Sequence, residues 1–134
     1  MSLNLEIVTP RGVVFQATAR HVKLPGSAGE FGLLTGHIPF MTTLQTGVIE
    51  LDVETGKPER VAISAGFVEV LPNKVVILAE TAETAESIDL TRAEAARKRA
   101  EEGLRTSENP IERERFHSAV MRARARIKAG SGTP

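Results

Sequence analysis

Residues 25–39, which read PGSAGEFGLLTGHIP, combine four glycines with one acid, Glu30, and one histidine, His37. Such a stretch could be a phosphate-binding loop, a metal site or a set of turns. A P-loop needs a lysine after its last glycine, and this stretch has none. A metal site would need more ligands than Glu30 and His37. His21 is not expected to join them, because the alternation of residues around it points its side chain outward with Lys23. The stretch therefore predicts a compact turn system that presents Glu30 and His37 on a surface, with no metal site.

The rest of the chain offers little for catalysis. Cysteine is absent, only three histidines occur, and no serine lies in a nucleophile motif, so a hydrolase is excluded. Nucleic-acid binding is disfavoured, because aromatic content is 4%, Trp and Tyr are absent and the net charge is zero. The N-terminal residues do not resemble a secretory signal, and no apolar run is long enough for a membrane span. We expect a cytosolic protein, or one that reaches a membrane only through a partner.

The zero net charge hides a difference between two parts of the chain. Up to Thr84 acids outnumber bases, and after it bases outnumber acids. Gly, Pro, Val and Phe are frequent in the first part, whereas Ala, Arg and Glu are frequent in the second. This shift predicts one unit over residues 1–84, a second over residues 85–130, and a disordered tail over residues 131–134.

The two units differ in the period of their apolar residues. Alternation or short apolar runs at residues 3–7, 49–53, 61–63, 67–70 and 74–78, separated by turn residues, predict an antiparallel β-sandwich or barrel. Apolar residues at spacings of three and four over residues 90–104 and 116–127 predict two helices joined as an antiparallel hairpin. The expected fold is α+β and mainly β.

Capping residues mark where the two helices begin. Asp89 suits the N-cap of the first helix. Asn109, Pro110 and Glu112 suit the N-cap, the first helical position and a capping box in the second. The apolar stripe of both helices is mostly alanine and buries little area. We therefore expect that the hairpin can detach or rearrange.

Two signatures carry a resemblance to a known family. The first runs PG..GEFGLL.GH.P....L..GVI over residues 25–49, and the second is VAISAGFVEV over residues 61–70, followed by Asn73 and an apolar run. Together they closely resemble the epsilon subunit of F-type ATP synthases, and the resemblance covers residues 3–128. It implies an N-terminal β-sandwich, a C-terminal helical hairpin and no catalytic centre.

The resemblance also implies a place and partners. An epsilon subunit belongs to the central rotor stalk, where its sandwich packs on the gamma subunit and on the c-ring. By similarity, Glu30 and His37 lie on or near that rotor interface. The alternative is that Glu30 is a surface acid and that His37 caps a turn.

The stretch IDLTRA over residues 88–93 is similar to a motif associated with ATP binding in bacterial epsilon subunits. The resemblance implies a regulatory ATP site. Arg92 and Arg99 of the first helix and Arg122 and Arg126 of the second could converge on a triphosphate if the hairpin is folded. The alternative is that Asp89 is only a helix cap and that the arginines form a solvated face. The full set expected at this site is Glu83, Ile88, Asp89, Arg92, Ala93, Arg99, Arg122 and Arg126.

The last helix is expected to present a basic face, with Arg113, Arg115, Arg122, Arg124, Arg126 and Lys128. The resemblance implies that an extended hairpin places these side chains against an acidic segment of the catalytic beta subunit, in the alpha/beta hexamer, and blocks rotation. The alternative is a solvated helix surface.

Two hypotheses follow. In the first, the chain is a non-catalytic rotor subunit that couples proton-driven rotation of the c-ring to ATP synthesis and that inhibits ATP hydrolysis. Its expected location is peripheral, on the cytoplasmic side of the inner membrane rather than in the thylakoid stroma. In the second, it is a free-standing β-sandwich ligand-binding module with a helical interaction arm. Copurification with gamma distinguishes them.

Overall fold

A computed structural model describes residues 3–34, 39–53, 56–72 and 74–131. Within these ranges the chain forms nine strands, one short 3-10 helix and two α-helices. The strands are β1 (Leu3–Thr9), β2 (Gly12–Gly26), β3 (Gly29–Leu34), β4 (Phe40–Leu44), β5 (Gly47–Val53), β6 (Glu59–Ile63), β7 (Gly66–Val70), β8 (Lys74–Ala79) and β9 (Ala82–Thr84). The helices are η1 (Ala85–Ser87), α1 (Leu90–Thr106) and α2 (Pro110–Ser131).

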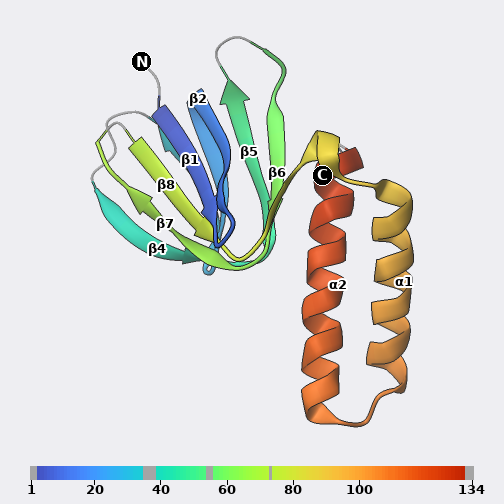
Figure 1. The fold of residues 1–134 in the computed structure, drawn as a ribbon. Helices are drawn as coiled ribbons and strands as arrows, with labels where there is room; N and C mark the ends of the chain where they lie inside the picture. Colours follow the sequence, from blue (N-terminus) through green and yellow to red (C-terminus); the bar gives the residue numbers. More distant parts are fainter. Residues whose placement is uncertain (1–2, 35–38, 54–55, 73, 132–134) are drawn as a thin grey trace.

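The strands form a β-sandwich beside the helical hairpin, as the sequence predicts (Figure 1). Hydrogen-bonded neighbours follow the order β1-β8-β7-β4-β2-β5-β6-β9, with β3 on β2 and a further pairing of β1 with β2. The antiparallel prediction is wrong for one pair, because β1 and β8 run parallel. β1 begins the chain and is far in sequence from β8, so no tight turn sets their relative direction.

The glycine-rich stretch is a β-hairpin rather than only a turn system. β2 continues to Gly26, and β3 pairs with it from Gly29 onward. Gly29 has a φ of +132°, which favours glycine. The glycines hide the alternation in β3, where Leu33 is buried and Phe31 packs against the core. The prediction for His37 lies outside the described residues.

The core of the sandwich contains the alternating residues that the sequence pattern places inward. Leu3, Leu5 and Ile7 of β1 are buried together with Val75 and Ile77 of β8, which lies beside β1. This cluster consists of residues before Ala82 and includes none from α1 or α2. The sandwich therefore has an apolar core of its own.

The hairpin packs against the sandwich through α2, which lies between the strands and α1 (Figure 1). Ala125 and Ala129 of α2 are buried against Val48 of β5 and Ala62 of β6, with Ile88 at the margin. All of these side chains are small or of moderate size. The contact therefore buries little apolar area, as the alanine-rich pattern predicts.

The expected tail is wrong at Ser131, because α2 continues through that residue. The prediction for residues 132–134 lies outside the described residues. Gly130 lies against the start of α1, where an added Cβ atom would be 2.9 Å from Cδ2 of Leu90 and 3.2 Å from Cγ2 of Ile88. This close packing holds the last turn of α2 beside the start of α1.

Candidate functional site

The candidate site is a cavity of about 320 Å³ where the connector, α1 and α2 meet. It is enclosed by polar and charged side chains together with two alanines of α1. The lining residues are Glu83, Ser87, Asp89, Arg92, Ala93, Ala96, Arg99 and Arg126. The fold thus brings together one strand end, the first turns of one helix and the last turns of the other.

The start of α1 positions the first group of these residues. The Oδ1 atom of Asp89 accepts a hydrogen bond from the backbone N–H of Arg92 at 3.0 Å, which confirms the predicted N-cap. Arg92 follows in the first turn of α1, and Arg99 lies about two turns further along. Ala93 and Ala96 lie between them on the cavity wall and leave room for a ligand.

Glu83 and Arg126 form the closest charged contact at this site. The Nε atom of Arg126 donates to Oε1 of Glu83 at 2.7 Å. The Glu83 side chain is 36% exposed and that of Arg126 is 30% exposed. The pair therefore ties β9 to α2 beside the cavity while both groups remain accessible to a ligand.

The charges of the cavity favour an anion. Its lining contains three guanidinium groups, from Arg92, Arg99 and Arg126, and two carboxylates, from Glu83 and Asp89. Within the described ranges, the guanidinium groups of Arg92 and Arg99 have no hydrogen bond or ion pair. Both can therefore make bidentate contacts with phosphate oxygens without first breaking an ion pair.

Two of the predicted nucleotide-site residues lie outside the cavity. Ile88 packs against the cluster that joins α2 to the sandwich. Arg122 lines a small adjacent depression, which it shares with Glu83 and Arg126. Conversely, Ser87 and Ala96 line the cavity and were not predicted. Ala96 had a sequence signal, since it lies between Arg92 and Arg99 at helical spacing.

The basic residues of α2 do not lie on one face, which corrects the prediction of a single basic helix face. Arg122 and Arg126 lie on the side of Glu83, whereas Arg124 and Lys128 line a groove with Glu30 on another side. The physical reason is the helical period, since residues two apart are about 200° apart around the axis.

The remaining two bases of this set lie near the loop end of α2. Arg113 donates from Nη1 to the carbonyl oxygens of Leu104 and, at 3.1 Å, of Ser107, so it caps the end of α1. Arg115 is exposed.

Glu30 lies at the sandwich surface, as the sequence predicts. Its carboxylate is 3.2 Å from Nζ of Lys23. It also lines a groove of about 220 Å³ between the sandwich and α2, which includes Met121, Arg124 and Lys128. Its side chain is 48% exposed and is therefore available to a partner.

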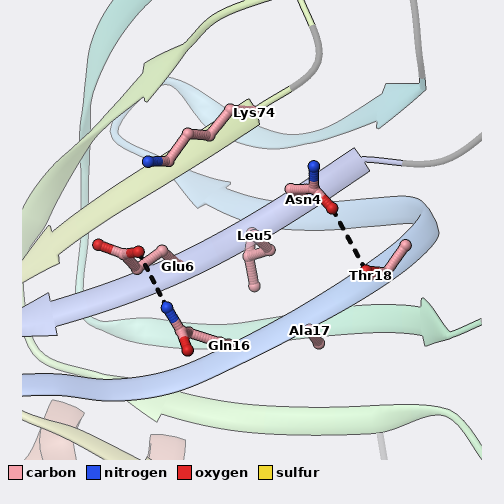
Figure 2. Close-up of a pocket in the computed structure, with 7 residues that line it drawn as sticks. All are labelled: Asn4, Leu5, Glu6, Gln16, Ala17, Thr18 and Lys74. Carbon is pink, nitrogen blue, oxygen red and sulfur yellow. Dashed lines mark hydrogen bonds between the residues drawn. The ribbon is translucent and has the colours of Figure 1, made fainter.

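A larger hollow of about 470 Å³ lies on the outer face of β1, β2 and β8 (Figure 2). Its polar side chains pair with one another, since Gln16 donates to Glu6 at 3.1 Å and Thr18 donates to Asn4 at 3.3 Å. Among the residues that the structure describes, Lys74 is the only cation lining it. Despite its size, this hollow lacks the converging, unpaired charges that make the smaller cavity a better ligand site.

The described residues also limit other chemistry. Among them, no group of three or more His, Asp or Glu side chains could hold a metal ion. Neither described helix is long and apolar enough to cross a membrane.

The chain is similar to known proteins over almost its whole length. Residues 2–85 match the profile of the ATP synthase delta/epsilon chain beta-sandwich domain, and residues 86–130 match that of the delta/epsilon chain long alpha-helix domain. The ATP synthase epsilon chains of Moorella thermoacetica and of Desulfitobacterium hafniense strain Y51 are each 48% identical over 128 residues, which is 96% of this chain and 96% of each relative.

Two solved structures share the fold. A chain in the Euglena gracilis mitochondrial ATP synthase structure, which contains OSCP, F1 and the c-ring, has a TM-score of 0.83 at 23% identity, over 97% of this chain and 81% of that one. A chain in the Tetrahymena thermophila mitochondrial ATP synthase central stalk and c-ring structure has a TM-score of 0.60 at 11% identity, over 97% of both chains.

Proposed function

Because this chain belongs to the ATP synthase delta/epsilon family and is an epsilon chain, we propose that it serves as a non-catalytic subunit of the central stalk. In this role it couples rotation of the c-ring, driven by proton flow, to ATP synthesis. The observation that carries the proposal is the match over residues 2–130, which includes both the sandwich and the helices.

The sandwich is the part that we propose docks on the gamma subunit and the c-ring. Its core is complete without the helices, so it can serve as a rigid body. Exposed apolar side chains on its surface, among them Phe67 and Leu78 on paired positions of β7 and β8, are suited to contact with a protein partner. Glu30 supplies an accessible charge for the rotor interface. The protein would then lie on the cytoplasmic side of the inner membrane, held there by the complex.

The cavity supports ATP as a regulatory ligand. Arg92 and Arg99 have free guanidinium groups, and Arg126 joins them from the other helix. Repulsion within the cavity is smaller than four unpaired arginines would produce, since Glu83 neutralises Arg126 and Arg122 lies to one side. ATP would still bind preferentially to the closed hairpin, because only closure brings Arg126 next to Arg92 and Arg99.

We propose that the hairpin inhibits ATP hydrolysis when it opens. In this opening α1 would separate from α2, and α2 would leave the sandwich, where it would lose a small apolar contact and the Glu83–Arg126 pair. The bases of α2 would then be available to an acidic segment of the catalytic alpha/beta hexamer. ATP in the cavity would oppose this opening and relieve the inhibition.

Copurification tests the central proposal. The tagged full-length chain should copurify with gamma and the catalytic hexamer in stoichiometric amounts. A variant with Glu30→Lys should assemble less well, whereas Glu6→Lys, which changes an acid in the hollow of Figure 2, should assemble normally. Recovery of the wild-type chain alone, without gamma, would contradict the proposed place in the stalk.

A further inference from the structure

A glycine of α1 contacts an aromatic ring of α2 near the loop end of the hairpin. Gly103 lies within α1, and Phe116 lies on α2. A Cβ atom added at Gly103 would be 2.5 Å from both Cε1 and Cζ of Phe116 and 2.7 Å from Cδ1. Non-bonded carbon atoms pack at about 3.5–4.0 Å. The ring of Phe116 therefore occupies the place of the side chain that residue 103 lacks.

This glycine is unfavourable for the helix that contains it. Glycine within a helix lowers the equilibrium constant for helix formation by a factor of about five relative to alanine. That penalty is present whether α1 is packed against α2 or separate from it. The contact with the ring exists only when the two helices are packed together. Gly103 thus favours the closed hairpin and disfavours a separate α1 helix.

The ring is a large part of the apolar contact near the loop. Elsewhere the buried interface between the helices consists mainly of alanines, including Ala93, Ala100 and Ala123. An aromatic side chain buries far more area than an alanine. Displacing the ring would therefore remove much of the apolar contact that holds this end of the hairpin closed.

We infer that Gly103 and Phe116 form a closure contact that selects the closed hairpin over separated helices. The contact acts without any ligand and involves none of the residues that line the cavity. Its influence on ATP hydrolysis rests on the proposed function, but its influence on hairpin closure does not. Substitution of either residue should change how often the hairpin opens.

Amide hydrogen exchange of the full-length chain, without ATP, measures that opening. Most of the stability of a helix in a protein comes from packing against its neighbours, so amides of α1 exchange when the hairpin opens. Gly103→Ala should accelerate their exchange by roughly tenfold or more, because a displaced ring exposes on the order of 100 Å² of apolar surface. Amides of the sandwich core should keep their wild-type rates.

The matched control is Gly56→Ala, in the sandwich. There the nearest atom to an added Cβ is Cγ2 of Val53 at 3.8 Å, which is ordinary contact. This variant makes the same chemical change and should leave exchange in α1 unaltered.

The decisive comparison repeats the Gly103→Ala substitution in a chain that already carries Phe116→Ala. There the ring is absent, so an alanine at residue 103 fits and improves helix propensity. Adding Gly103→Ala to that background should slow exchange in α1, by up to about fivefold. The proposal is overturned if Gly103→Ala has no effect on exchange in α1, or slows it, in the otherwise wild-type chain. It is also overturned if the substitution accelerates exchange in α1 equally in both backgrounds, or if exchange of the sandwich amides becomes faster together with that of α1. Failure to copurify with gamma would leave these results unchanged, so the two proposals fail separately.

Discussion

Arg92 offers the sharpest test of the cavity as a nucleotide site. Its guanidinium group lines the cavity and has no hydrogen bond or ion pair within the described ranges. Its backbone N–H donates to Asp89, and substitution of the side chain leaves that cap intact. We expect that Arg92→Ala lowers the affinity for ATP without lowering the stability of the ligand-free protein.

The magnitude follows from the contacts that the side chain can make. A hydrogen bond to a charged group contributes about 1.5–3 kcal/mol, so the dissociation constant should rise about 10- to 150-fold. Arg92→Lys keeps the charge but loses the planar pair of donors, so its loss should be intermediate.

Arg126→Ala provides the contrast. It removes a cavity cation and also the 2.7 Å pair with Glu83. Because both side chains are about one-third exposed, that pair contributes roughly 0.5–1.5 kcal/mol to stability. This variant should therefore lose ATP affinity and also melt a few degrees lower.

Titration calorimetry of the isolated chain measures the affinities, and thermal unfolding followed by circular dichroism measures the stabilities. Wild-type affinity in Arg92→Ala would refute a phosphate site in this cavity. A lower melting temperature in Arg92→Ala would show that the side chain is structural. If the wild type does not bind ATP at millimolar concentration, ATP is not a regulatory ligand of this chain and Asp89 is only a helix cap.

Three further predictions concern the two units. A truncation after Ala85 should fold and bind gamma, with a lower melting temperature because Val48 loses its cover from α2; an unfolded product would contradict the division at this point. Asn109→Ala should destabilise the hairpin by about 1 kcal/mol, measured by thermal unfolding, because its Oδ1 atom accepts from the N–H groups of Ile111 and Glu112. Alanine at Arg115, Arg122 and Arg126 together should raise ATP hydrolysis by the assembled enzyme without affecting assembly, and unchanged hydrolysis would mean that these bases are only surface.

Local patterns in the sequence predicted much of the secondary structure. Alternation predicted β1, β5 and β7, and the caps Asp89 and Asn109 predicted where the two helices begin. The capping box at Glu112 was wrong in its second half, since that carboxylate accepts from the hydroxyl of Ser107 instead of the backbone of Asn109. The backbone N–H of Asn109 donates to the same hydroxyl group. The side chain of Ser107, two residues before the expected motif, competed for the contact.

Strands that contain several glycines were harder to recognise. β3 alternates inward and outward at Phe31, Gly32 and Leu33, but an apolar pattern with glycine at the outward positions resembles a loop. Gly32 lies so close to the imidazole of His21 that an added Cβ atom would be 2.6 Å from Nε2. Only the pairing with β2 shows that this glycine accommodates a neighbour on the adjacent strand.

The sequence by itself determined the features that depend on neighbours within a few residues: the helix caps, the strand alternation, the alanine stripe and the spacing of Arg92 and Arg99 along one helix. The tertiary structure alone decided which charges meet, because such contacts join distant segments. Glu83 and Arg126 are 43 positions apart, and their pairing depends on how α2 packs against the sandwich. The same packing decides what each side of α2 faces, because rotation of a helix about its axis is set by the side chains that it buries.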